Sequence, residues 1–202
     1  MKIIEFDLDL KQLTKDCRRI NNKVTKAYSK QEVPHAKKYE NALSKQLEQA
    51  PASSKLHDFY NVFTFPYSSI NQLYKEICRV FNDVNEYNNN YYVHAWLNYQ
   101  QKGESIPWHN HWKALSDLDE TYVASYYVNT EPSVTRYKWA NGQVFDHHTK
   151  NNTFSIYEDE GDTHMVNEWQ QEDPRIGISM DFVPMHYIQS TPYLLNTWIP
   201  VI

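Results

Sequence analysis

The chain of 202 residues contains 20 lysines and arginines and 25 aspartates and glutamates, with a formal net charge of −5. Its length favours a single domain over residues 1–202. No basic cluster is interleaved with aromatic side chains and no apolar run approaches membrane-spanning length, so neither a nucleic acid nor a membrane is an expected partner.

The first ninety residues combine one predicted strand with helices. KIIEFDLDL at residues 2–10 alternates in part and predicts an opening strand. Residues 10–50 have a helical composition interrupted near Val33 and Pro34, which predicts two surface helices. A further helix is predicted in SSINQLYKEICRVFNDVNEYNNN, with serine as the candidate N-cap and the asparagine-rich stretch as its end. Its apolar face is formed by Ile70, Leu73, Ile77, Val80, Phe81 and Val84.

From Tyr91 onward the hydrophobic period changes from about 3.6 to about 2. Short aromatic or β-branched segments are separated by turn residues: YYVHAWLNYQ, TYVASYYVN, RYKWANGQVFD, NTFSIYEDE, THMVNEW and RIGISMDFV. Strands without intervening helices exclude a parallel βαβ sheet. The predicted fold class is α+β and mainly β: a jelly roll, sandwich or barrel at residues 91–202, with the helices of residues 1–90 packed on one face.

The N-terminus and the cysteines indicate a soluble cytoplasmic protein. The first residues lack the long apolar region and the small-residue cleavage site of a signal peptide. Cys17 and Cys78 have neither CxxC nor zinc-ribbon spacing, so we expect them to be reduced and structural.

His109 and His111 are separated by one residue in the segment PWHNHW. If this segment is extended, both side chains point to the same face and offer two adjacent metal ligands. His164 in EGDTHMVNEW is the candidate for a third ligand. Three histidines leave coordination positions open for a substrate or for oxygen. The alternative is that the pair lies on a solvated strand edge.

Arg175 begins the segment RIGISMDFV, with Gly177 and Ser179 on the same face of the predicted strand. A buried guanidinium needs an anion, and its fork matches a carboxylate with two hydrogen bonds. The serine hydroxyl can donate a further hydrogen bond, and the glycine leaves room for a ligand. The alternative is a surface ion pair of Arg175 with Glu172 or Asp173.

Together these features resemble the iron(II)- and 2-oxoglutarate-dependent dioxygenases, in particular the prolyl-hydroxylase-like branch, over residues 91–184. The resemblance implies a double-stranded β-helix, an Fe(II) ion, 2-oxoglutarate as cosubstrate and hydroxylation as the reaction. In that family HxD and a distal histidine hold the metal, and His109 and His164 match the two histidines. Arg175 and Ser179 match the residues that bind the distal carboxylate of 2-oxoglutarate.

The resemblance also implies cosubstrate contacts from two tyrosines. Tyr99 precedes the HxH pair, and Tyr127 lies on the next predicted strand. Asn98, in the strand predicted for residues 91–100, is a further candidate for the pocket wall.

One position departs from the family pattern, because His111 stands where the family has its carboxylate ligand. HNHW followed by VASYYVN is similar to a subgroup of uncharacterised oxygenases of phages and marine bacteria, which implies the cytoplasm of a phage-infected host cell as one location. Three neutral imidazoles compensate less of the charge of Fe(II) than two imidazoles and a carboxylate do. Asp117, Asp119 and Glu120 in the following loop are therefore candidates for an additional oxygen ligand.

The cupins offer a second comparison within the same fold. GESIPWHNH, from Gly103 to His111, has their spacing of a glycine, five residues and HxH. A cupin-type three-histidine metalloprotein needs no keto acid and therefore no counterpart of Arg175 with Ser179. A third alternative is a non-catalytic jelly-roll binding protein. The DHH segment at residues 146–148 is expected in a solvated loop, and the sequence leaves open the oligomeric state and whether the substrate is small or macromolecular.

Overall fold

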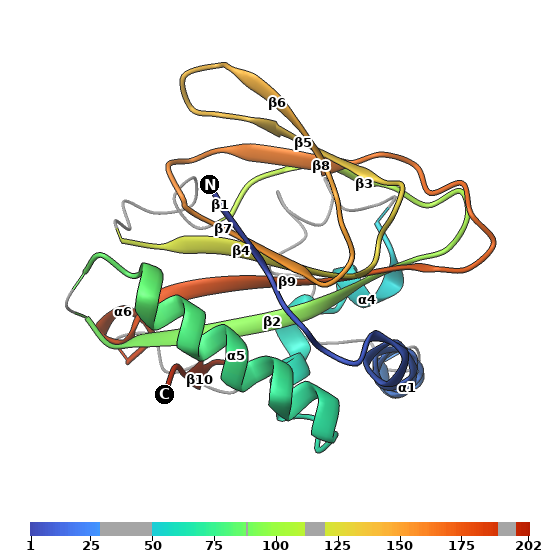
Figure 1. Ribbon diagram of the computed structural model, residues 1–202, viewed down its shortest axis with the longest axis horizontal. Helices are drawn as coiled ribbons and strands as arrows, with labels where there is room; N and C mark the ends of the chain where they lie inside the picture. Colours follow the sequence, from blue (N-terminus) through green and yellow to red (C-terminus); the bar gives the residue numbers. More distant parts are fainter. Residues whose placement is uncertain (29–49, 88, 112–119, 190–196) are drawn as a thin grey trace.

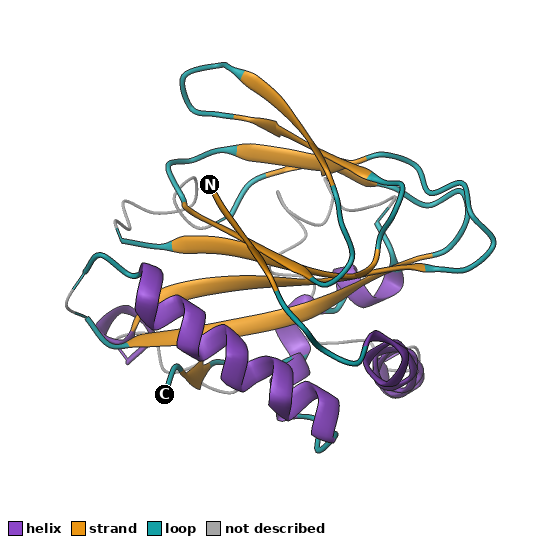
Figure 2. Ribbon diagram, viewed as in Figure 1, coloured by secondary structure: helices purple, strands orange, loops and turns teal. Residues whose placement is uncertain are grey.

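Two antiparallel β-sheets face each other in the computed structural model, and helices cover the outer face of one of them (Figures 1 and 2). The larger sheet lies between the helices and the smaller sheet. The structure describes residues 1–28, 50–87, 89–111, 120–189 and 197–202.

The larger sheet has the strand order β1-β7-β4-β9-β2-β10, and each neighbouring pair is antiparallel. The strands are β1 (Lys2–Glu5), β2 (Tyr91–Gln100), β4 (Tyr122–Asn129), β7 (Thr153–Glu158), β9 (Arg175–Pro184) and β10 (Ile199–Pro200). The opening strand is shorter than predicted, because only its first residues pair with β7. Strands β2 and β9 pair along their whole length, and the strand order places β4 and β9 at the centre of the sheet.

The smaller sheet has the strand order β3-β8-β5-β6. Its strands are β3 (Ile106–His109), β5 (Val134–Lys138), β6 (Val144–His148) and β8 (Thr163–Val166). From β2 to β9 the chain alternates between the two sheets except at the β5–β6 hairpin, which is the arrangement of a jelly roll. The predicted fold class, with helices on one face, is confirmed.

The expectation of a solvated loop at residues 146–148 is wrong, because these residues belong to β6. In its pairing with β5, Asp146 lies opposite Arg136 and accepts two hydrogen bonds from its guanidinium on the exposed face. The next residue, His147, points the other way and is buried.

Helices α1 (Leu10–Tyr28) and α5 (Ser68–Val84) pack beneath the larger sheet. The predicted apolar face of α5 is confirmed: Ile70, Leu73, Ile77, Val80 and Phe81 are buried. The serines are not its N-cap, because Ser68 is already helical and Tyr67 takes the N-cap position. Ser69 instead donates to Asp16 of α1. Of the two helices predicted in residues 10–50, α1 is the first, and the second falls within residues 29–49, outside those described.

Short elements cover the edge of β2 that β10 leaves open. They are α4 (Ala52–Lys55), η1 (His57–Phe59) and η2 (Val62–Thr64), and α6 (Met185–Gln189) follows β9. The Leu97 amide donates to the Tyr60 hydroxyl at 2.8 Å, and the Tyr99 amide donates to Ser53 Oγ at 3.1 Å. Side chains thus satisfy edge N–H groups that no neighbouring strand reaches.

Alternation along the strands separates an apolar face from a polar one. In β9, even-numbered residues from Ile176 to Phe182 join the main hydrophobic core between the larger sheet and the helices. The odd-numbered residues lie on the opposite face, between the sheets: Arg175, Gly177, Ser179 and Asp181. Every residue of β9 is buried, so these polar groups lie in the interior of the protein.

Two further expectations concern the cysteines and the membrane. Cys17 and Cys78 are both buried and form no disulfide, as predicted. Within the described ranges, no helix combines the length and the apolar character needed to cross a bilayer.

Candidate metal centre

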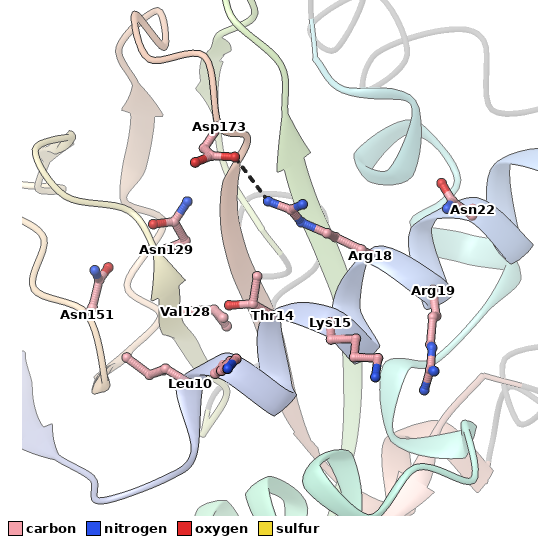
Figure 3. Close-up of a pocket in the computed structure, with 11 residues that line it drawn as sticks. Leu10, Thr14, Lys15, Arg18, Arg19, Asn22, Val128, Asn129, Asn151 and Asp173 are labelled. Carbon is pink, nitrogen blue, oxygen red and sulfur yellow. Dashed lines mark hydrogen bonds and ion pairs between the residues drawn. The ribbon is translucent and has the colours of Figure 1, made fainter.

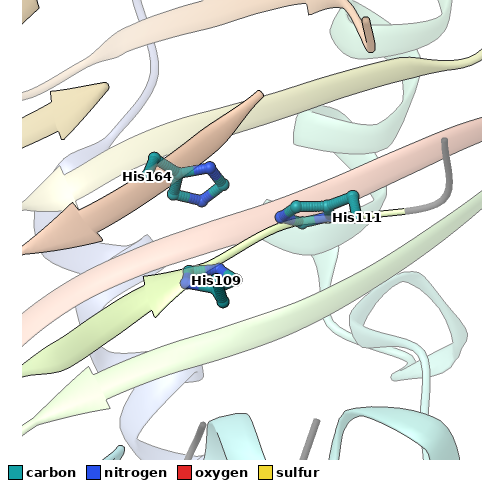
Figure 4. A group of neighbouring side chains, drawn as sticks. All are labelled: His109, His111 and His164. Atoms are coloured by element: carbon teal, nitrogen blue, oxygen red, sulfur yellow. The ribbon is translucent and has the colours of Figure 1, made fainter. Parts of the chain in front are cut away.

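Three histidines meet between the sheets (Figure 4). His109 ends β3, His111 follows it, and His164 lies in β8, directly opposite His109 in the β3–β8 pairing. The ring centroids of His109 and His164 are 4.2 Å apart, those of His111 and His164 5.0 Å, and those of His109 and His111 5.4 Å. One ring nitrogen from each histidine lies within 4.8 Å of the other two, so the structure brings together the three predicted ligands in a group that could hold one metal ion.

The second ring nitrogen of each histidine has its own partner. His109 Nδ1 is 2.9 Å from a backbone carbonyl, His111 Nδ1 is 2.6 Å from Asp181 Oδ1, and His164 Nδ1 is 3.3 Å from the Tyr157 hydroxyl. The Nε2 atoms are left for a ligand, and that of His111 is buried without a hydrogen-bond partner. An unpartnered buried nitrogen is unfavourable, so this atom fits a site that binds a metal ion.

Burial and the Asp181 carboxylate set the charge of the three rings. Burial lowers the pKa of His109 to about 4, and the neighbouring His111 adds to this effect. Burial likewise lowers the pKa of His164 well below its ordinary value, with His109 and His111 adding to it. For His111, burial acts to lower the pKa, but the Asp181 carboxylate outweighs it and the net shift is upward. His109 and His164 are therefore neutral at pH 7, which is the form that binds metals.

Arg175 lines the same pocket as His109 and His164. It is 2% exposed. Its Nε donates to Ser133 Oγ at 2.8 Å and its Nη1 donates to Gln100 Oε1 at 2.9 Å. Burial lowers the pKa of Arg175 to about 10, so the guanidinium remains charged at neutral pH.

The surface ion pair considered for Arg175 is absent, because both carboxylates are engaged elsewhere. Glu172 pairs with Lys102, and Asp173 pairs with Arg18. In the part of the chain that the structure describes, Arg175 forms no ion pair and its hydrogen-bond acceptors are neutral. A buried cation without an anionic partner indicates a binding site for an anion.

Three other predicted residues line this pocket. Asn98 Nδ2 donates to Ser179 Oγ at 2.6 Å, and the Tyr127 hydroxyl lies 2.9 Å from Ser155 Oγ. A Cβ added at Gly177 would lie 3.5 Å from Arg175 Nη1, so the glycine leaves the guanidinium uncovered. The full lining is Asn98, Ile106, His109, Ser125, Tyr127, Thr135, His164, Val166, Arg175, Gly177 and Ser179.

Tyr99 and Glu120 do not reach this pocket. Tyr99 follows Asn98 in β2, and adjacent residues of a strand point to opposite faces, so Tyr99 packs against the main core instead. Of the two tyrosines expected to contact a cosubstrate, Tyr127 lines the pocket and Tyr99 does not. Glu120 accepts a hydrogen bond from Asn89 and is not part of the histidine group. Asp117 and Asp119 lie outside the described residues.

Several residues of the site were not predicted. Asp181 contacts His111, Tyr157 contacts His164, and Gln100 and Ser133 hold Arg175. Two of them carry a sequence signal, since Asp181 shares the period-2 face of Arg175 and Gln100 shares that of Asn98. Ser133 and Tyr157 carry none, because only the pairing of distant strands brings them to the site.

A wider cleft of about 730 Å³ lies beside α1 (Figure 3). Its basic side chains are partly neutralised, because Arg18 pairs with Asp173 and Arg19 pairs with Asp16. None of the three histidines lines it. Size therefore does not identify the candidate site, whereas the narrower pocket is lined by His109, His164 and the guanidinium of Arg175.

Comparisons with known proteins agree on the fold. No protein-family model and no curated protein matches the chain. Among solved structures, the chain is similar to a prolyl-4-hydroxylase from Pseudomonas putida, with a TM-score of 0.55 and 12% identity over 90% of this chain and 91% of that chain. It is also similar to a nickel complex of the non-heme monooxygenase ThoJ, with a TM-score of 0.54 and 12% identity over 90% of this chain and 73% of that chain. These similarities show that the chain has the fold of such oxygenases.

Proposed function

We propose that this protein is an Fe(II)- and 2-oxoglutarate-dependent dioxygenase that hydroxylates a C–H bond of its substrate. The observation that carries the proposal is that one pocket is lined by two of the three histidines that could hold a metal ion, and by a buried arginine without an ion pair among the described residues. A keto acid with a second carboxylate is the ligand that such a pocket can hold at both ends. The fold alone does not support this conclusion, because jelly rolls serve many functions.

In this proposal the iron is held by His109, His111 and His164 through ring nitrogens that other groups leave free. Bound iron and 2-oxoglutarate supply the oxidising chemistry, in which decarboxylation of the keto acid is coupled to hydroxylation of the substrate. The protein contributes the ligand geometry and a narrow pocket between two sheets that limits access of water.

Arg175 binds the distal carboxylate of 2-oxoglutarate. Ser133 and Gln100 hold Nε and Nη1, which orients the guanidinium and leaves further N–H groups for a bidentate contact. Ser179 lies on the same face of β9 as Arg175, and its hydroxyl can donate to the cosubstrate while it accepts from Asn98. Tyr127, Asn98 and Ser179 line the same pocket as His109, His164 and Arg175.

A cupin-type metalloprotein that uses three histidines and no keto acid is the second candidate. One observation favours it: among the described residues, the ligand group contains no carboxylate. The buried Arg175 favours the dioxygenase, because a cation in the same pocket as the histidines fits the second carboxylate of a keto acid such as 2-oxoglutarate.

Anaerobic titration with Fe(II) and then with 2-oxoglutarate tests the proposal. We expect stoichiometric iron binding, followed by a visible absorption band that requires both iron and the keto acid. Pyruvate is the matched control, since it keeps the keto acid but has no distal carboxylate for Arg175 and should bind more weakly. Iron binding without any keto-acid response supports the cupin-type protein, and no stoichiometric metal supports a non-catalytic binding protein.

A further inference from the structure

Asp181 makes a short contact with the histidine that occupies the unusual ligand position. Its Oδ1 lies 2.6 Å from His111 Nδ1, and the two side chains are 8% and 5% exposed. Asp181 comes from β9 in the larger sheet, whereas His111 follows β3 of the smaller one. The contact therefore links the two sheets at the metal centre.

The orientation of this contact decides which nitrogen of His111 faces the metal. Because a carboxylate accepts hydrogen bonds, Nδ1 carries the proton and donates to Asp181. Nε2 then presents a lone pair, and it is this atom that is buried without a partner. Trp96 packs beside the imidazole, with ring centroids 5.8 Å apart and an interplanar angle of 28°, which restricts rotation of the ring.

The carboxylate of Asp181 also supplies negative charge near the histidine group. Three neutral imidazoles bring no negative charge to a divalent cation, and a buried charge without compensation is unfavourable. Among the described residues, Asp181 is the carboxylate that is hydrogen-bonded to a member of the histidine group. Its charge lies one imidazole ring away from the metal position and acts through His111.

We propose that Asp181 is a positioning residue that replaces the missing carboxylate ligand by acting through His111. It selects the His111 tautomer, orients the ring and supplies the negative charge that a directly bound carboxylate would otherwise bring. This inference rests on the metal site of the proposed function and not on the identity of the keto acid.

Co(II) binding to Asp181→Asn tests the role of the charge. Asparagine retains an oxygen that can accept from His111 Nδ1 but removes the negative charge. We expect Co(II) affinity measured by calorimetry to fall about 10- to 100-fold, as for other partners of metal-bound histidines, and the visible Co(II) spectrum to shift. Asp16→Asn is the matched control: Asp16 is also a buried carboxylate, but it lies beneath the opposite face of the larger sheet, and its loss should leave Co(II) affinity unchanged.

A double variant should restore Co(II) affinity, which a purely structural role of Asp181 does not predict. The double variant combines His111→Asp with Asp181→Asn. It moves the single negative charge from residue 181, which contacts the ligand, to residue 111, which is the ligand, and the new asparagine can donate a hydrogen bond to the new carboxylate. We expect this protein to bind Co(II) more tightly than Asp181→Asn alone. His111→Asp by itself places two carboxylates near each other, and their repulsion is unfavourable. We therefore expect a lower free energy of unfolding for metal-free His111→Asp than for the metal-free double variant.

The outcomes separate this inference from the proposed function. Wild-type affinity of Asp181→Asn for Co(II), within about threefold, overturns the role of Asp181 but leaves the metal site intact. No stoichiometric Co(II) binding by the wild-type protein overturns both. If Asp181→Asn does not fold, the double variant decides: Co(II) binding close to that of the wild type supports the inference, and a folded double variant that binds no Co(II) overturns it.

Discussion

Arg175 is a buried cation held by neutral groups. Burial lowers its pKa only to about 10, so the guanidinium keeps its charge at pH 7 inside the protein. The hydrogen bonds from Arg175 to Ser133 and Gln100 compensate part of the lost hydration but provide no opposite charge. The remaining attraction for an anion is the physical basis for the keto-acid binding that we propose for Arg175.

Replacing Arg175 should separate keto-acid binding from metal binding. Arg175→Ala is expected to weaken 2-oxoglutarate affinity by roughly 10- to 150-fold, because a charge-assisted bidentate contact contributes about 1.5–3 kcal/mol. Arg175→Lys keeps the charge but loses the fork, so we expect an intermediate affinity. Calorimetry with Fe(II) should give equal metal affinities for all three proteins, and equal 2-oxoglutarate affinities would contradict the assignment.

Gly177→Ala tests the space beside the guanidinium. The new Cβ would lie 3.5 Å from Arg175 Nη1 and 3.8 Å from the Tyr126 carbonyl, which are ordinary van der Waals distances. We therefore expect the thermal melting curve to change little, whereas the methyl group should hinder a ligand carboxylate and weaken 2-oxoglutarate binding about tenfold or more. A variant with wild-type affinity would show that the ligand does not pass this position.

Local alternation could predict part of the site but not its long-range contacts. Asn98 and Tyr99 were both expected to face the pocket, although the period of a strand allows only one of two adjacent residues to do so. The structure places Asn98 in the pocket and Tyr99 against the main core. The same period, applied from Arg175 along β9, predicts an inward Asp181. Its contact with His111 was not predictable, because it depends on how two separate sheets stack.

At the scale of elements, long segments with a strong hydrophobic period were predicted correctly, whereas the ends of short segments were not. The apolar face of α5 and the bounds of β2 follow directly from spacings of 3.6 and 2. The predicted segment that ends at Asp146 includes the start of β6, but the end of this strand was expected in a loop. Val144 and Phe145 are exposed on this edge strand, so no regular burial pattern marks its course. Turn-like composition near residues 146–148 could not reveal that pairing with β5 makes this segment a strand.

The junction of α1 and α5 depends on a buried carboxylate. The Asp16 side chain is 2% exposed and accepts hydrogen bonds from Gln12, Arg19 and Ser69. Burial acts to raise the pKa of Asp16, but these hydrogen bonds outweigh it and the net shift is downward. A carboxyl group whose pKa is lower in the folded state stabilises the fold above its unfolded pKa of about 3.9 and loses this effect as the pH falls through the folded value.

Asp16→Asn should therefore be destabilising at neutral pH and less so in acid. We expect a loss of about 1–2 kcal/mol in the free energy of unfolding at pH 7, because charge-assisted hydrogen bonds become neutral ones while Arg19 remains partly exposed. The gap between wild type and variant should narrow below about pH 4. Urea unfolding at pH 7 and at pH 3 measures both values, and a gap independent of pH would assign the effect to packing.

At the scale of the whole molecule, the larger sheet separates the main hydrophobic core from the candidate site. Its outer face carries the main hydrophobic core with α1 and α5, and its inner face carries the polar groups of the candidate site. Phe81 of α5 illustrates the outer side, since its ring stacks on Phe182 with centroids 4.2 Å apart and packs edge-on against Tyr91 and Tyr122. The fold should therefore not require the metal.

Metal removal and Phe81→Ala should act independently. Treatment with EDTA is expected to leave the circular dichroism spectrum unchanged. The melting temperature should fall by about 5–10 °C relative to protein with free metal at 100 times its Kd, because metal binding at that concentration stabilises the fold by about 2.7 kcal/mol. Phe81→Ala should cost about 3–5 kcal/mol with or without metal and should not change the metal Kd, because the cavity opens on the far side of the sheet. Unfolding of the wild-type protein by EDTA would mean instead that the metal holds the two sheets together, as expected for a structural ion in a non-catalytic protein.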